Sequence, residues 1–177
     1  MNHEIKNASL VIVDTDISFN SIYGKGYVPQ DYIEDIKRAN FLIIPEEKFR
    51  EEEILLFPET TREFFEYVKD NPVDAIISDI AISDEDFQKI EMHSATITVA
   101  TIIVELVVLP IATGLVTSFL YDLIKKYRRK DDETTAEVNM IVEDKKTKRS
   151  KKITYKGPVS GVKEALNAAA ENLFKED

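Results

Sequence analysis

Three aspartates stand where predicted β-strands end, and carboxylates in that position can hold a metal ion. Asp14 and Asp16 close an apolar run at residues 9–16, and Asp79 closes a later run at residues 73–79. In sheets with parallel strands, ligands bind beyond the carboxyl ends of the strands. Hard cations such as Mg²⁺ prefer oxygen ligands. The three carboxylates are therefore the candidate metal ligands, although aspartate also ends strands for purely structural reasons.

The sequence around the first pair is similar to a known catalytic motif. The run Val-Ile-Val-Asp-Thr-Asp at residues 11–16 resembles the nucleophile motif of haloacid-dehalogenase phosphatases. This resemblance implies a Mg²⁺-dependent phosphatase-like enzyme in which Asp14 is the nucleophile and Asp16 the acid/base. The lysine and the further acidic pair that this family also requires have no assigned positions in this chain.

The composition argues against several other kinds of site. The chain of 177 residues has no cysteine, which excludes thiolate chemistry and disulfides. Its two histidines, His3 and His93, lie far apart in the sequence, which disfavours a histidine-ligated metal or a Ser-His-Asp triad. No glycine-rich nucleotide-binding motif is present. The leading interpretation therefore has no catalytic residues and no cofactor.

Residues 1–93 are predicted to form a small α/β unit with a mostly parallel sheet, because short apolar runs alternate with helical patterns. The first strand, at residues 9–16, is expected to be buried, and residues 20–28 are expected to be a loop. Thr60 and Glu63 are expected to form a capping box at a helix start. Further strands are predicted at residues 41–44, 54–57 and 73–79, and helices at residues 29–39 and between Thr60 and Asn71.

The longest apolar stretch, residues 94–121, contains one charged residue, Glu105, and is interrupted at Pro110. It is longer than the roughly 20 residues that a membrane-spanning helix needs, and basic residues follow it. Against a span, a carboxylate near the middle would cost roughly 2.5–3.5 kcal/mol on insertion scales.

A soluble core is the alternative, and we prefer it. Residues 95–109 would then form one buried element, and Pro110 would open a buried helix that reaches about residue 129. Glu105 is expected at the rim of this core, without a buried partner such as Lys126 or Arg128.

The remaining residues are predicted to form a β-hairpin and a helix. Residues 137–143 and 151–156 alternate between apolar and polar side chains, and residues 144–150 form a polar, basic turn. A Gly-Pro pair is expected to end the hairpin, and Ser160 is expected to cap the helix. The apolar face of this helix consists of Val162, Leu166, Ala169 and Leu173.

This order of elements is similar to that of the effector-associated constant components, small proteins of bacterial conflict and defence systems. The resemblance covers about residues 110–175 and rests on the pattern of apolar helix, basic residues, hairpin, Gly-Pro and amphipathic helix. It implies a non-catalytic adaptor or sensor that works beside a separate effector. It assigns no site residue.

Charge divides the chain near the same point. Residues 1–93 carry 9 Lys+Arg and 21 Asp+Glu, whereas residues 94–177 carry 14 and 12. The acidic first part disfavours nucleic acid as a partner. Basic clusters at residues 125–130 and 145–152 are expected to be a solvated helix end and a hairpin tip.

We therefore predict an α/β protein in two parts, residues 1–93 and 94–177. Its predicted function is that of a non-enzymatic interaction component of a prokaryotic defence or signalling system, located in the cytoplasm, with a protein partner encoded nearby. One alternative is a membrane-anchored effector or sensor that spans the bilayer through residues 94–121. Another is the phosphatase-like enzyme at Asp14 and Asp16.

Overall fold

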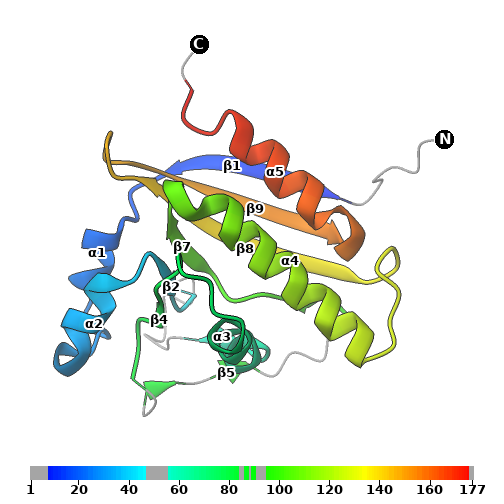
Figure 1. The fold of residues 1–177 in the computed structure, drawn as a ribbon, viewed down its shortest axis with the longest axis horizontal. Helices are drawn as coiled ribbons and strands as arrows, with labels where there is room; N and C mark the ends of the chain where they lie inside the picture. Colours follow the sequence, from blue (N-terminus) through cyan, green and yellow to red (C-terminus); the bar gives the residue numbers. More distant parts are fainter. Residues whose placement is uncertain (1–7, 47–55, 84–85, 88, 91–94, 176–177) are drawn as a thin grey trace.

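A computed structural model describes residues 8–46, 56–83, 86–87, 89–90 and 95–175. They form a mixed β-sheet with helices packed on both faces (Figure 1). This confirms the predicted α/β class with its central apolar helix, C-terminal hairpin and final helix. In spatial order the strands are β1 (Ser9–Thr15), β9 (Arg149–Pro158), β8 (Thr135–Asp144), β7 (Ile102–Glu105), β2 (Phe41–Ile43) and β4 (Ser78–Ile80), and β6 (Ile97–Thr98) also pairs with β8.

Side chains alternate between the two faces of the sheet, so the molecule has two cores. On one face, Phe41 and Val104 pack beneath α3 (Thr61–Asp70), α4 (Leu109–Lys126) and α5 (Val162–Glu171). On the other face, Leu42 and Ile103 pack beneath α1 (Phe19–Tyr23) and α2 (Ile33–Arg38). The short elements are β3 (Phe57–Pro58), β5 (Lys89–Ile90) and the 3-10 turns η1 (Gln30–Tyr32), η3 (Leu106–Val108) and η4 (Val159–Gly161).

The prediction that the first strand is buried in a parallel sheet is wrong. β1 is an edge strand that pairs antiparallel with β9, and most of its residues are exposed. Of the N-terminal strands in the main sheet, only β2 and β4 pair with each other, in parallel. An apolar run indicates a strand, but it does not say which strands will lie beside it.

Two local predictions in the N-terminal part are also corrected. The expected loop at residues 20–28 begins inside α1, whose start has a capping box between Ser18 and Ser21. Thr60 precedes α3 as expected, but its hydroxyl donates to the carbonyl of Thr98 at 2.8 Å and caps no helix N–H. The first two residues of the strand predicted at 54–57, and both histidines, lie outside the described residues.

The apolar stretch divides at Pro110, as the soluble interpretation predicts. Pro110 lies in the first turn of α4, which ends at Lys126, slightly earlier than expected. Residues 95–109 form β6, β7 and η3 instead of a single element.

Glu105 ends β7 at the rim of the sheet, with its side chain 23% exposed. Its Oε1 lies 2.9 Å from Nζ of Lys145, on the hairpin turn. The rim position was expected and the partner was not.

The C-terminal hairpin is confirmed, with Val138, Met140 and Tyr155 buried on the face that α5 covers. The apolar face predicted for the last helix is also buried. The Gly-Pro pair forms the last two residues of β9, so the hairpin ends there as expected. Ser160 lies in η4, and the residue at the N-cap of α5 is Gly161, so Ser160 is not the cap.

Candidate functional site

The three aspartates predicted as metal ligands do not come together. Asp14 is on β1 and Asp79 on β4, and these strands are the opposite edges of the main sheet. Asp14 and Asp16 are exposed, and the nearest cation to Asp14 is Nζ of Lys151 at 3.8 Å, on the neighbouring strand β9. Within the described ranges, no group of three or more His, Cys, Asp or Glu side chains is arranged to hold a metal ion. The carboxylates lie apart because β1 pairs with the C-terminal hairpin and not with β2 or β4.

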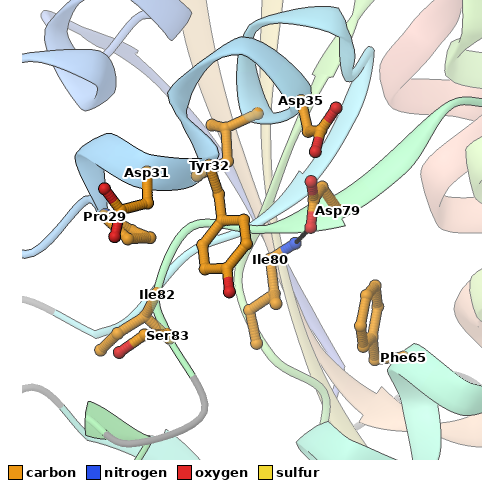
Figure 2. A pocket seen from close by; sticks show the side chains of 10 residues that line it. Pro29, Asp31, Tyr32, Asp35, Phe65, Asp79, Ile80, Ile82 and Ser83 are labelled. Carbon is orange, nitrogen blue, oxygen red and sulfur yellow. Dashed lines mark hydrogen bonds between the residues drawn. The ribbon is translucent and has the colours of Figure 1, made fainter.

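A cavity of ≈ 620 Å³ lies beside Asp79, between α2, β4 and α3. Figure 2 shows the carboxylates of Asp35 and Asp79 turned toward one another, from α2 and β4 respectively. Burial raises the pKa of the Asp79 carboxyl, while the N–H of Ile80 and the charge of Lys69 oppose the rise and Asp35 adds to it. The cavity is also lined by Pro29, Asp31, Tyr32, Ile36, Phe65, Ile80, Ile82 and Ser83.

The chemistry of this cavity is that of an acidic recess with apolar walls. Its carboxylates supply negative charge and hydrogen-bond acceptors, which suit a cationic group. It brings together one of the predicted aspartates, Asp79, with two that the sequence did not indicate, Asp31 and Asp35.

At this cavity, side chains occupy part of the outer edge of β4. The N–H groups of Ala81 and Phe41 donate to the carbonyls of Ile43 and Ile77 respectively, so alternate residues of this strand face β2. The residues between them turn their backbone groups outward. Of these outward groups, the carbonyl of Ser78 accepts from Nζ of Lys69 at 2.7 Å, and the N–H of Ile80 donates to Oδ1 of Asp79 at 2.8 Å.

The opposite edge of the sheet, β1, has no such protection. All seven residues of β1 pair with β9 on one side, and no other described strand pairs with β1. Four consecutive apolar residues are exposed there: Leu10 at 39%, Val11 at 50%, Ile12 at 40% and Val13 at 49%. Natural edge strands are usually blunted by lysine, proline or a bulge. β1 contains no lysine or proline and pairs in unbroken register, and its only charged residue is Asp14.

The sequence indicated Asp14 as a candidate site residue, but it did not indicate that the four apolar residues before it form an exposed edge. A continuous apolar run is typical of a strand buried on both sides. The alternation that marks a half-exposed strand is absent, so no pattern in the run indicated an open edge.

The two basic clusters lie at separate places in the fold. Residues 125–130 span the end of α4, and residues 145–152 surround the hairpin turn, at the other end of the long strands (Figure 1). Arg129 in the first cluster donates to the carbonyl of Ala95 at 3.1 Å, which is a structural contact. The clusters therefore do not merge into one basic surface.

One helix of the described chain, Leu106–Lys126 with its 3-10 turn, is long and apolar enough to cross a membrane. In this fold, 61% of its apolar window is buried inside the molecule, as in a core helix. Comparisons of the chain with protein-family models, curated proteins and solved structures find no match.

Proposed function

We propose that this protein is a non-enzymatic interaction component, an adaptor or sensor, which binds another protein chain along the outer edge of β1. The observation that carries the proposal is the exposed apolar edge formed by Leu10, Val11, Ile12 and Val13. Unpaired backbone N–H and C=O groups on such an edge are a template for a further strand.

The contrast between the two edges supports β1 as the binding edge. Two of the outward backbone groups of β4, the carbonyl of Ser78 and the N–H of Ile80, are occupied by Lys69 and Asp79. Those of β1 have no strand beside them among the described residues, and the apolar side chains next to them lose hydrophobic exposure when a partner strand covers them. Main-chain hydrogen bonds would supply affinity, and the alternating side chains would supply specificity.

The biological setting of the proposal comes from the sequence. The resemblance of residues 110–175 to effector-associated constant components suggests a prokaryotic defence or signalling system, with a separate effector encoded nearby. A cytoplasmic location fits the packing of α4 against the sheet, since most of its apolar side chains are buried.

The test is co-purification of protein partners with tagged wild-type protein and with the edge variant Val11→Lys. A lysine in the middle of the exposed edge should weaken partner capture about tenfold or more, which is 1.4 kcal/mol. Ile77→Lys is the matched control, because Ile77 is 52% exposed near the other edge. The same partners at the same yield with both variants would contradict the proposal, provided that thermal unfolding shows both variants to be folded.

A further inference from the structure

We propose that the chain bound along β1 is a second copy of this protein, so that two subunits form a two-fold symmetric dimer with one continuous sheet. The inference rests on the proposed function, since it names the partner of the same edge. It is argued from the register that β1 would adopt against itself.

Symmetry restricts that register to a few choices. Directly opposed residues in an antiparallel pair point to the same face, so a two-fold axis between identical strands must place one residue opposite itself. The seven residues Ser9–Thr15 all pair only if that residue is the central one, Ile12. A shift of the axis to Val11 or Val13 leaves strand residues unpaired.

The side chains match in this register. On the face that α5 covers, Ile12 lies beside the buried Ile153 of β9. The dimer would extend this pair into a row of four isoleucines across the two subunits. On the other face, Val11 would lie opposite Val13 of the partner subunit, and the symmetric pair would complete a cluster of four valines. Exposed apolar area is therefore covered on both faces.

The charges match as well. Asp14 would lie opposite Leu10 of the partner subunit and keep its contact with Lys151 of its own subunit. An axis at Asp14 would oppose two carboxylates, and like charges opposite one another destabilise a strand pair. The register that pairs the whole strand is thus also one without opposed like charges.

The other edge explains why assembly would stop at two subunits. Pairing of β1 with β4 of another copy would be head-to-tail and would continue into a filament. Lys69 and Asp79 already occupy two of the outward backbone groups of β4, the carbonyl of Ser78 and the N–H of Ile80. The more open edge on a second copy is therefore another β1, and a two-fold contact between two β1 strands leaves no β1 edge for a third subunit.

The first experiment is sedimentation equilibrium of the full chain. Wild-type protein and the control Ile77→Lys should have twice the mass of one chain, and Ile12→Lys should have the mass of one chain while its far-UV circular dichroism stays that of the folded protein. Mixing Ile12→Lys with Ile12→Asp should restore the dimer, because each residue would face its counterpart across the axis. A monomeric wild-type protein, or a dimer that persists in Ile12→Lys, would overturn the proposal.

Cysteine cross-linking tests the register independently, since the chain has no cysteine of its own. The Cα atoms of directly opposed residues are about 4.5–5.5 Å apart, within the range that a disulfide spans. Under mild oxidation Ile12→Cys should therefore form a covalent dimer by itself, whereas Val11→Cys should require Val13→Cys as its partner. Absence of these cross-links would refute the register.

The results separate this inference from the proposed function. If the protein is monomeric but Val11→Lys still abolishes capture of a different protein, the edge is an interaction site and the second copy is the wrong partner. If neither self-association nor capture depends on β1, both proposals fail.

Discussion

Tyr155 carries a hydroxyl group into the C-terminal core, and two glycines make room for it. The side chain is 1% exposed, its Oη donates to the carbonyl of Pro158 at 2.7 Å, and burial raises its pKa. A Cβ atom at Gly161 would lie 2.7 Å from Oη, and no other atom except the ring Cζ would be near it. A Cβ at Gly157 would lie 2.7 Å from Oη and also 2.7 Å from Cβ of Ala8.

The first prediction uses this difference between the two glycines. Gly161→Ala and Gly157→Ala should each lower the free energy of unfolding by about 1–3 kcal/mol, because the added methyl group overpacks the core. Tyr155→Phe should cost about 0.5–1.5 kcal/mol through the lost hydrogen bond. In the Tyr155→Phe background, Gly161→Ala should become nearly neutral, whereas Gly157→Ala should remain costly because Ala8 is still in the way.

Urea unfolding of the single and double variants measures these couplings. Gly26→Ala is the control, since nothing lies within 4 Å of its added Cβ. Equal costs for Gly161→Ala with and without the Tyr155 hydroxyl would contradict the packing described.

The second prediction concerns Asp79, whose pKa is raised mainly by burial. Because the folded protein then binds this proton more tightly than the unfolded chain, its stability falls as the pH rises between the two pKa values. Asp79→Asn removes the charge and keeps an oxygen acceptor for the N–H of Ile80. The variant should therefore be more stable than wild type at pH 7, and the gain should vanish below the ordinary aspartate pKa of about 3.9.

Thermal unfolding of wild type and variant across this pH range is the measurement. The exposed Asp74 provides a control, because Asp74→Asn should change stability by no more than about 0.5 kcal/mol at any pH. A variant less stable than wild type at pH 7 would show that the Asp79 charge is needed in the fold, most directly by Lys69.

At the scale of elements, α4 is a core helix that buries one hydroxyl group without a hydrogen bond. The Oγ1 of Thr113 is buried, and no hydrogen-bond partner for it exists in the described parts of the chain. One turn later, Thr117 donates from its own Oγ1 to the carbonyl of Thr113 at 2.8 Å. The two threonines are therefore similar in burial and different in hydrogen bonding.

The third prediction compares these residues. Thr113→Val should raise the free energy of unfolding by about 1 kcal/mol, because it replaces an unsatisfied hydroxyl by a methyl group of similar size. Thr117→Val should be neutral or slightly destabilising, since it removes a hydrogen bond that is made. Chemical denaturation of both variants tests the pair. The opposite ranking would mean that the Thr113 hydroxyl is satisfied in solution.

The fourth prediction concerns the location of α4. Its outward face carries Gly114, Ser118, Asp122 and Lys125, all exposed, while the opposite face is buried against the sheet and α5. The protein should therefore remain in the supernatant after high-speed centrifugation without detergent. Recovery in a membrane pellet that resists carbonate washing would contradict the core position of this helix.

Sequence patterns predicted the elements better than the contacts between them. The hairpin, the last helix and the start of α4 near Pro110 followed from local periodicity and local backbone restrictions. The position of β1 did not, because its neighbour β9 lies more than a hundred residues away in sequence. For the same reason, the sequence did not indicate the ion pair of Glu105 with Lys145 or the cavity that joins Asp79 to Asp35.

At the scale of the molecule, the acidic and basic parts of the chain share one sheet. The strands of residues 94–177 form the middle of the sheet, with β1 beside β9 on one side and β2 beside β7 on the other. Both cores are shared as well. The ring of Phe64 lies 6.0 Å from that of Phe41 in the first part and 5.0 Å from that of Phe119 in the second. The net charge of the chain therefore changes near residue 93, but the hydrophobic cores contain residues from both sides of this point.

The last prediction follows from this shared packing. If residues 1–93 and 94–177 unfolded separately, Leu42 would leave Ile103 and Ile141 uncovered in the second core, and β7 would lose the neighbour on one of its sides. The exposed apolar area would make such an intermediate unfavourable, so the chain should unfold in a single cooperative transition.

The chain has no tryptophan, so one can be introduced as a local reporter. Tyr23→Trp places it on α1 in the first part, and Tyr127→Trp places it after α4 in the second. For each variant, the urea midpoint from tryptophan fluorescence should coincide with the midpoint from far-UV circular dichroism of the same variant. Separate midpoints would show that the two parts are independent folding units joined only at their strand edges.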